Sequence, residues 1–357
     1  GAAVWTACLL FFQTFLLFGY LYAHLLSQIS SVKRQFNIHA ALLVLSLVFL
    51  PIAVVDDITL IDNEQPLANI LSLLMLSIGI PYLLLSSTGP LLQRWFSLHK
   101  HEQLPYQLYS LSNVASLGAL LSFPFFIEPL FTGSQQTTLW SIGYFCYLAV
   151  SLLLIKQLYS QNLDEKLASE QIKSINSTEN HSHTWLWLGL SITGVVLLIA
   201  TTNAMTQNIP PVPFLWILPL CLYLLSFIIS FHSPKWYVRW YWLLLFMPSA
   251  IIAIFMFFIG SQFGIVTQVV LYSSILFSAC MICHGELARF KPQVHKLTWF
   301  YLVIAFGGVV GSVLVAFVAK ALFVQFLEFP IAIVLVFCLL AYSVYLSHQR
   351  ATKLVWA

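Results

Sequence analysis

Residues 297–319 read LTWFYLVIAFGGVVGSVLVAFVA, 23 consecutive residues without a charged side chain. A helix of roughly 20 apolar residues is long enough to cross the hydrocarbon layer of a membrane. Eleven stretches of the chain meet this requirement, and 60% of all residues are hydrophobic while 8% are charged. The sequence therefore predicts an all-α polytopic membrane protein with eleven transmembrane helices. They run over 3–27, 38–55, 67–90, 105–128, 137–155, 184–202, 213–232, 240–259, 264–283, 297–325 and 329–348.

The few charged residues indicate how the spans are oriented. Fourteen of the 15 Lys and Arg residues fall in gaps that face the same side if the spans alternate, and Lys320 falls on the other side. The gap after the second span instead carries four acidic residues, Asp56, Asp57, Asp62 and Glu64. Because basic loops are retained in the cytoplasm, we expect the first residue outside and the C-terminus in the cytoplasm.

The two halves of the chain show an internal repeat. Residues 108–109 (LY) and 115–119 (ASLGA) align with 300–301 (FY) and 307–311 (GGVVG) at a constant offset of 192. Small residues four apart lie on one helix face and permit close packing. The duplication predicts a 6+6 arrangement of which this chain contains 5+6, so we expect one further span ahead of residue 1. Parallel repeats are a transporter architecture with a site at the repeat interface.

The longest polar gap separates the halves. We expect an N-terminal helical half over 1–158, a flexible cytoplasmic linker over 159–183 and a C-terminal helical half over 184–357. The linker is rich in Ser, Asn, Glu and Lys.

The sequence Cys280-Met281-Ile282-Cys283-His284 matches the attachment pattern of c-type haem. The charge pattern places it at a cytoplasmic span end, whereas c-type haem is normally attached on the outer face, so we expect no haem. All ten His residues are predicted to lie at or beyond cytoplasmic span ends. No second Cys or His pair of suitable spacing lies nearby, so we expect no metal site and no cofactor.

Ionisable residues are nearly absent from the predicted spans, so the candidate substrate-binding residues are polar or aromatic. A Gln or Asn side chain either contacts a substrate or joins two helices, and aromatic faces attract cations. Asn113 is the leading candidate because it lies one turn from the small-residue face of the repeated helix. The full set is Gln13, Tyr20, Tyr109, Asn113, Trp216, Tyr223 and Tyr301.

Two basic motifs are candidates for gating. Residues 88–94 (TGPLLQR) and 283–289 (CHGELAR) each end in an Arg just after a span, Arg94 and Arg289. Glu286 and Arg289 are three apart and can pair on one helical turn. The alternative is that these side chains only extend to the membrane interface and orient the spans.

The segments that carry a family resemblance are 3–13 (AVWTACLLFFQ), 19–24 (GYLYAH), 87–95 (STGPLLQRW), 109–113 (YSLSN), 122–129 (SFPFFIEP), 201–203 (TTN), 212–216 (VPFLW) and 283–289. Together they resemble the membrane portion of bacterial fused major-facilitator/spermidine-synthase-like proteins. The resemblance covers nearly all of the chain. It implies a major-facilitator-like bundle in the bacterial inner membrane, a polyamine or related small amine as substrate, and a soluble synthase-like partner on the cytoplasmic side.

Members of that family usually carry a further first span and a C-terminal Rossmann-like domain. This chain stops at Ala357, directly after its last span, and contains no Gly-rich loop after a strand and no acidic catalytic motif. We therefore expect no catalytic residues and no aminopropyl transfer by this chain alone, and no nucleic-acid partner.

Three functions remain open. The first is a transporter-like module of a spermidine-synthase-like system. The second is a membrane anchor or scaffold that does not transport and holds a soluble aminopropyltransferase-like enzyme on its basic rim. The third is a membrane-embedded enzyme or a haem protein that uses Cys280, Cys283 and His284. The scarcity of carboxylates within the spans counts against a polycation path.

Overall fold

The computed structural model describes residues 2–52, 66–99, 104–161, 163–164, 167–168, 183–206, 214–259, 262–323 and 327–355. Within these ranges the regular structure is helical, and eleven helices are long and apolar enough to cross a membrane. The predicted all-α membrane architecture and its number of spans are confirmed. The acidic residues 56–64 lie outside the described ranges, as does most of the predicted linker.

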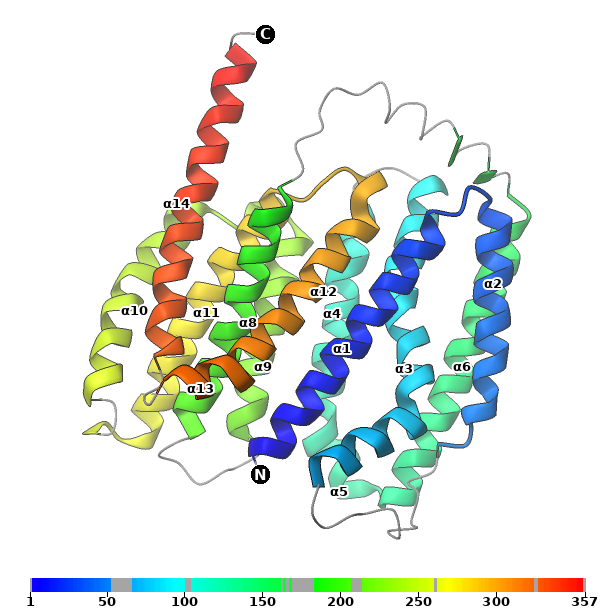
Figure 1. Cartoon of the computed structure of the whole chain (residues 1–357), viewed down its shortest axis with the longest axis horizontal. Helices are drawn as coiled ribbons and strands as arrows, with labels where there is room; N and C mark the ends of the chain where they lie inside the picture. The colour runs from blue at the N-terminus through cyan, green and yellow to red at the C-terminus, as the bar shows by residue number, and fades with distance from the viewer. Residues whose placement is uncertain are drawn as a thin grey trace. The chain divides into compact units, whose positions relative to one another are not determined.

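The described residues contain eleven long helices, which Figure 1 labels. They are α1 (Ala2–Ser27), α2 (Val32–Leu45, continued by the 3₁₀ turn η1, Ser46–Phe49), α3 (Pro66–His99), α4 (Leu104–Ser122), α6 (Gly133–Tyr159), α8 (Thr184–Thr206), α9 (Phe214–His232), α10 (Arg239–Ile259), α11 (Ile265–Arg289), α12 (Leu297–Val313) and α14 (Glu328–Val355). Short 3₁₀ turns precede α10 (η4, Pro234–Trp236) and α12 (η6, Val294–Lys296).

The helices divide into two compact units. Unit 1 comprises Gly1–Pro105, Ser122–Ser182 and Pro292–Leu302. Unit 2 comprises Tyr106–Leu121, His183–Lys291 and Val303–Ala357. Most of α4 therefore packs with helices of the second half of the chain.

In unit 1, α1 packs along α3, and α2 lies beside α6. The first pair approaches closely at Gly19, where an added Cβ would collide with the Oγ of Ser86 and lie 2.8 Å from the carbonyl oxygen of Leu83. Glycine permits this approach because it has no side chain. The core is formed by apolar side chains of all four helices, including Leu43 and Leu91, which are fully buried.

In unit 2, α11 lies in the middle and packs against α8, α9, α10 and α14. Every residue from 278 to 287 is consequently buried. A helix enclosed on all sides is apolar all round unless its polar side chains find partners inside the protein. His284 and Glu286 are the ionisable polar side chains of this segment with the greatest need for a hydrogen-bonding or charged partner inside the protein.

The small residues of α12 pack as predicted. A Cβ added at Gly307 would lie 2.6 Å from the Cβ of Ser191, and one at Gly311 would lie 2.9 Å from the carbonyl oxygen of Ile192, so both glycines allow α12 to approach α8. On α4, the corresponding helix of the first half, Gly118 has no such neighbour within 4 Å.

The repeat predicted from the sequence recurs as a structural irregularity. After α4 the chain forms a π-helical segment, η3 (Phe123–Ile127), and then the single turn α5 (Glu128–Leu130). After α12 it forms the π-helical segment η7 (Leu314–Ala319) and then α13 (Lys320–Leu322). Adding the offset of 192 to 128–130 gives 320–322. The packing pairs α1–α3 and α2–α6 likewise recur as α9–α11 and α10–α14, which confirms two related halves.

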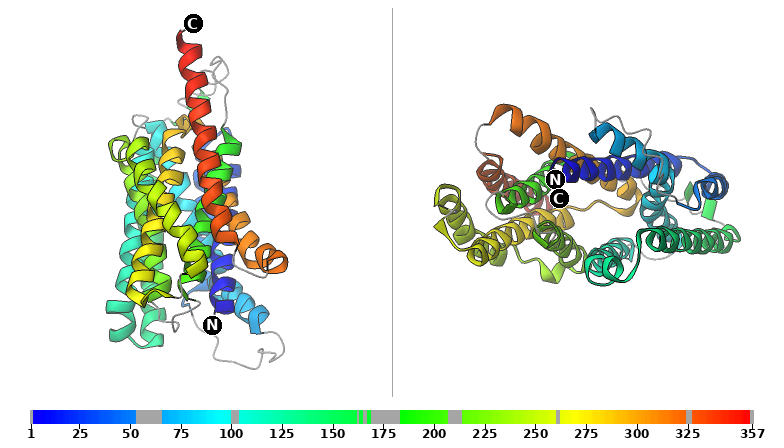
Figure 2. Two further views of the ribbon diagram at one scale, coloured as in Figure 1. Left: turned by 90° about the vertical axis from the view of Figure 1, so that its left-hand side faces the viewer. Right: turned by 90° about the horizontal axis from the view of Figure 1, so that it is seen from below.

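The last helix is the longest in unit 2. α14 has 28 residues, and its C-terminal turns extend past the ends of α10 and α11 (Figures 1 and 2). The part of α14 that is apolar enough to span a membrane ends at Gln349.

Candidate functional site

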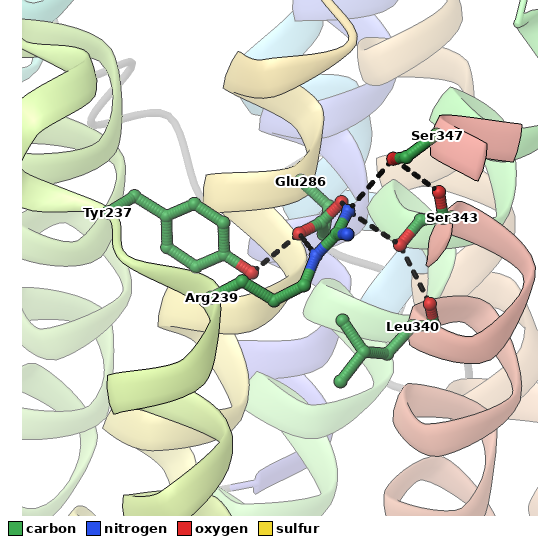
Figure 3. Close-up of polar contacts among 6 residues, drawn as sticks. All are labelled: Tyr237, Arg239, Glu286, Leu340, Ser343 and Ser347. Atoms are coloured by element: carbon green, nitrogen blue, oxygen red, sulfur yellow. Dashed lines mark hydrogen bonds and ion pairs between the residues drawn. The ribbon is translucent and has the colours of Figure 1, made fainter. Parts of the chain in front are cut away.

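A buried ion pair joins three helices at one end of unit 2 (Figure 3). Arg239, the first residue of α10, donates from Nε to Oε1 of Glu286 at 2.8 Å and from Nη2 to Oε2 at 2.6 Å. Glu286 belongs to the last turns of α11 and its side chain is 0% exposed, while that of Arg239 is 16% exposed. This two-point geometry fixes both direction and distance between the helices.

Hydroxyl groups complete the site. The hydroxyl of Tyr237, two residues before α10, donates to Oε1 of Glu286 at 2.7 Å. The guanidinium of Arg239 also lies 3.4 Å from the Oγ of Ser343 and 3.3 Å from that of Ser347, both on α14. We call these five residues the ion-pair site. It connects α10, α11 and α14.

Tyr237 reaches the carboxylate because Gly285 leaves room for its ring. A Cβ added at Gly285 would collide with Cδ2 of Tyr237. Burial, followed by the neighbouring carboxylate of Glu286, raises the pKa of Tyr237. Tyr237 therefore remains a neutral hydrogen-bond donor at physiological pH.

The two charges occupy unfavourable positions with respect to their own helices. Glu286 lies near the C-terminus of α11 and Arg239 at the N-terminus of α10, whereas helix dipoles favour cations at the C-terminus and anions at the N-terminus. A buried carboxylate is also costly unless it is paired. Each charge is thus retained by the other, and separation of α10 from α11 would leave both uncompensated.

The predicted partner of Glu286 was wrong. Both carboxylate oxygens are bound by Arg239 and Tyr237, whereas Arg289, the expected partner, is exposed. Arg94 of α3, in unit 1, is only 7% exposed. The repeat offset of 192 places Arg94 at the position of Glu286, so corresponding helices carry buried charges of opposite sign.

A second buried group lies two residues before Glu286. The Nδ1 of His284 is 2.7 Å from the Oγ of Ser226 on α9. The imidazole stacks on Phe227, with ring centroids 3.7 Å apart, and meets the ring of Tyr223 edge-on at 4.7 Å. We call His284 with Tyr223, Ser226, Phe227 and Tyr109 the aromatic cluster.

One imidazole nitrogen in this cluster lacks a partner. Ser226 donates its hydroxyl hydrogen to the carbonyl oxygen of Tyr223 at 2.7 Å, so we assign the imidazole hydrogen to Nδ1 of His284, which donates it to Ser226. Nε2 then has a bare lone pair. It is buried and has no hydrogen-bond partner within the described residues. It faces the backbone of Gly194 on α8, where an added Cβ would be 3.2 Å away.

Three predicted substrate residues meet at the aromatic cluster. Tyr109 of α4 packs edge-on against Phe227 at 5.9 Å. Asn113, one turn further along, donates from Nδ2 to the carbonyl oxygen of Tyr109 at 2.8 Å. Tyr223 contacts Phe227 and His284. Trp216 lies seven residues before Tyr223 on the same helix and is half-buried.

The other predicted residues belong to unit 1. Tyr20 of α1 and Tyr301 of α12 have ring centroids 6.2 Å apart. Gln13 is half-buried and lies seven residues before Tyr20 on α1. The predicted set is therefore distributed over both units, with one group around Tyr109 and Tyr223 and another around Tyr20 and Tyr301.

The two thiols of the Cys-x-x-Cys-His motif are fully buried. Cys280 and Cys283 are each 0% exposed. In the described part of the chain, no three His, Cys, Asp or Glu side chains come together in a way that could hold a metal ion. The motif contributes packing around the aromatic cluster.

Two histidines that the sequence places at span ends are buried among the helices. His284 lies within the candidate span Ile265–Arg289 and is 0% exposed, and His39 lies within Val32–Phe49 and is 1% exposed. Arg239, Tyr237 and the α14 serines were also missed. One signal was available: the chain after residue 183 contains two carboxylates, Glu286 and Glu328, so a basic residue that turns inward has few possible partners.

No protein-family model matches the chain, and no curated protein matches it. Two solved structures are similar to it. One is a Major Facilitator Superfamily transporter, FucP, in the outward conformation, with 13% identity, a TM-score of 0.42 and coverage of 93% of this chain and 89% of that chain. The other is the E. coli fucose:proton symporter FucP carrying an Asn-to-Ala substitution, with 14% identity, a TM-score of 0.42 and coverage of 96% and 99%.

Proposed function

We propose that the chain is the transporter-like membrane module of a spermidine-synthase-like system and handles a polyamine or a related small amine. The observation that supports this most is the unpartnered Nε2 of His284 among aromatic rings. A protonated amine needs both kinds of group, because aromatic faces attract its charge and its N–H groups donate to a free lone pair. Tyr109 and Tyr223 add two further rings, both packed edge-on against Phe227.

In this proposal, the ion pair between Arg239 and Glu286 holds the helices together when the aromatic cluster is closed. The aromatic cluster is closed in the structure, since Phe227 and His284 are 4% and 0% exposed. An amine enters only if α9 and α11 separate around His284. Glu286 lies two residues further along α11 and is held to α10 by Arg239. Breaking and re-forming this pair therefore accompanies opening and closing.

The proposal includes an orientation in the bacterial inner membrane with the C-terminus in the cytoplasm. The 14 basic residues that share one side support it, because basic loops stay in the cytoplasm. A soluble synthase-like partner would then meet the same side. A C-terminal fusion to alkaline phosphatase, which is active only outside the cytoplasm, should be inactive, and an active fusion would contradict the orientation.

Uptake of labelled putrescine, cadaverine and spermidine into proteoliposomes tests the function. We expect saturable uptake of at least one of them by the wild type. Tyr223→Leu should reduce uptake by roughly 3- to 30-fold, the equivalent of one cation–π contact of about 0.5–2 kcal/mol. Tyr342→Leu, which alters an exposed tyrosine of α14, is the matched control and should leave uptake unchanged.

The scaffold function makes a different set of predictions. A folded protein that takes up none of the three amines, yet retains a purified spermidine-synthase-like enzyme on an affinity column, would contradict transport and support the anchor. Equal uptake by the wild type and Tyr223→Leu would be consistent with transport but would show that the amine does not bind at the aromatic cluster.

A further inference from the structure

His284 and Glu286 lie on different sides of α11. Residues two apart on an α-helix are separated by about 200° around the helix axis, because each residue adds about 100°. The imidazole of His284 accordingly meets Ser226 and Phe227 of α9. The carboxylate of Glu286 is instead bound by Arg239 at the start of α10. The backbone of α11 therefore separates a ligand at the imidazole from this carboxylate.

The acidic side chains of unit 2 lie away from the aromatic cluster. The sequence of this unit contains two of them, Glu286 and Glu328. Both oxygens of Glu286 are occupied within the ion-pair site. Glu328 begins α14 and precedes Ser343 of the ion-pair site by 15 residues, which is about 22 Å along the helix. A cation beside His284 thus has neutral groups of unit 2 as its partners.

The aromatic cluster presents a hydrogen-bond acceptor to such a cation. Nε2 of His284 is buried and has no hydrogen-bond partner in the part of the chain that the structure describes. The ring centroids of Phe227 and Tyr223 lie 3.7 Å and 4.7 Å from that of the imidazole. One ammonium group can donate an N–H to the lone pair, and the rings attract its charge. A second ammonium on the same ligand would be buried without a carboxylate, which is costly.

Glycine at position 194 leaves the lone pair of His284 uncovered. Gly194 belongs to α8, and a Cβ added to it would lie 3.2 Å from Nε2. A methyl group at this distance is closer than ordinary van der Waals contact and would shield the nitrogen from a donor. The absence of a side chain at this position therefore keeps the nitrogen able to accept a hydrogen bond once the helices separate.

We infer that the aromatic cluster selects amines with a single positive charge, whose primary ammonium group donates a hydrogen bond to Nε2 of His284. The ligand class is a primary monoamine with an apolar chain, because the groups around the imidazole are aromatic rings. A diamine is a weaker ligand of the same cluster, since one of its two ammonium groups has no anionic partner. The inference rests on the proposed function, because it names the substrate class of the same site.

Three ligands with the same carbon chain test this selectivity. They are n-butylamine, putrescine, which adds a second ammonium group, and butyltrimethylammonium, which keeps the charge and has no N–H. Isothermal titration of the whole chain in nanodiscs, with empty nanodiscs as the blank, measures their affinities at pH 7. Putrescine should bind more weakly than n-butylamine by roughly tenfold or more, because its second charge is buried unpaired. Butyltrimethylammonium should also bind more weakly by roughly tenfold or more, because a hydrogen bond from a charged donor is lost.

Variants identify the acceptor. His284→Phe removes Nε2 and keeps an aromatic ring, so it should bind n-butylamine no more tightly than butyltrimethylammonium. His232→Phe, at an exposed histidine of α9, is the matched control and should keep the wild-type order of the three affinities. If His284→Phe does not fold, Gly194→Ala shields Nε2 while the imidazole remains, and it should abolish the same preference.

The results that would overturn the inference differ from those that would overturn the proposed function. Putrescine that binds as tightly as n-butylamine would refute selection for a single charge. Equal affinities of the wild type for n-butylamine and butyltrimethylammonium would refute donation to His284. Failure to bind n-butylamine, in a protein that still takes up a polyamine, would refute the inference alone. Absence of both binding and uptake would refute the proposed function together with it.

Discussion

The two units place basic residues at the start of corresponding helices and accommodate them in opposite ways. In unit 1, Lys33 and Arg34 at the start of α2 are exposed, and the carboxylate of Asp164 accepts the first backbone N–H of the helix at 2.5 Å. In unit 2, Arg239 at the start of α10 turns inward to Glu286. The carboxylate of unit 1 thus caps a helix N-terminus, which favours negative charge, whereas that of unit 2 lies near a helix C-terminus, which disfavours it.

The polar contacts between helices are also neutral in one unit and charged in the other. In unit 1, the η1 turn that continues α2 is joined to α6 by a neutral hydrogen bond, that of Ser46 with Tyr144. Around α10, α11 and α14, unit 2 is joined by a buried ion pair. A neutral hydrogen bond contributes about 0.5–1.5 kcal/mol, whereas breaking a buried ion pair costs about 3–5 kcal/mol. Unit 2 should therefore tolerate far less change at its polar contacts than unit 1.

The largest effect is expected for Arg239→Ala. The substitution leaves the carboxylate of Glu286, which is 0% exposed, without its counter-ion. The free energy of unfolding should fall by about 3–5 kcal/mol. Reversible unfolding of the purified protein in bicelles with increasing SDS measures this change.

Two controls separate the buried charge from the general loss of an arginine. Arg289→Ala removes an exposed arginine near the same helix end and should change stability by less than about 0.5 kcal/mol. The double variant Arg239→Met with Glu286→Met removes both charges and should recover most of the stability. If the double variant is as unstable as Arg239→Ala, packing rather than charge accounts for the loss.

The sequence was sufficient for the spans and for the repeat because both depend on local properties. An uncharged stretch such as 297–319 is long enough to cross a membrane wherever it is placed, and the glycines at 307 and 311 share one face by spacing alone. The partner of Glu286 depends instead on how three helices pack. Arg289 is close in sequence, but it is exposed, and the observed partner, Arg239, is 47 residues distant.

Burial of histidine could not be read from the sequence for a similar reason. His39 and His284 are close to basic gaps, so a charge-based assignment placed them at the interface. In the structure each is accommodated in the interior by a hydroxyl from another helix, Tyr22 or Ser226. A neutral imidazole is tolerated in an apolar interior when one of its nitrogens is hydrogen-bonded. Only the tertiary structure reveals which hydroxyl takes part in that hydrogen bond.

A smaller effect is expected where the ion-pair site depends on close packing. Gly285→Ala would place a methyl group against the ring of Tyr237, which should move away from Glu286. We expect a loss of about 1–3 kcal/mol, the usual cost of overpacking. Gly118→Ala on α4, where nothing lies within 4 Å of the added atom, is the matched control and should be neutral or slightly stabilising. Equal effects at both positions would indicate that the change acts through helix propensity alone.

The smallest effect is expected at the neutral hydrogen bond between Ser46 and Tyr144 in unit 1. The Oγ of Ser46 donates to the carbonyl oxygen of Leu43 at 2.6 Å, so Tyr144 must donate to Ser46. Ser46→Ala leaves the Tyr144 hydroxyl buried without an acceptor and should cost about 1 kcal/mol, while Ser274→Ala, at an exposed serine of α11, should cost almost nothing. Adding Tyr144→Phe removes the unpaired hydroxyl as well, so the double variant should be more stable than the sum of the single changes predicts. Strict additivity in the same SDS titration would mean that the two hydroxyls do not interact. The contrast between the neutral contact of Ser46 with Tyr144 and the ion pair of Arg239 with Glu286 would then lose its energetic basis.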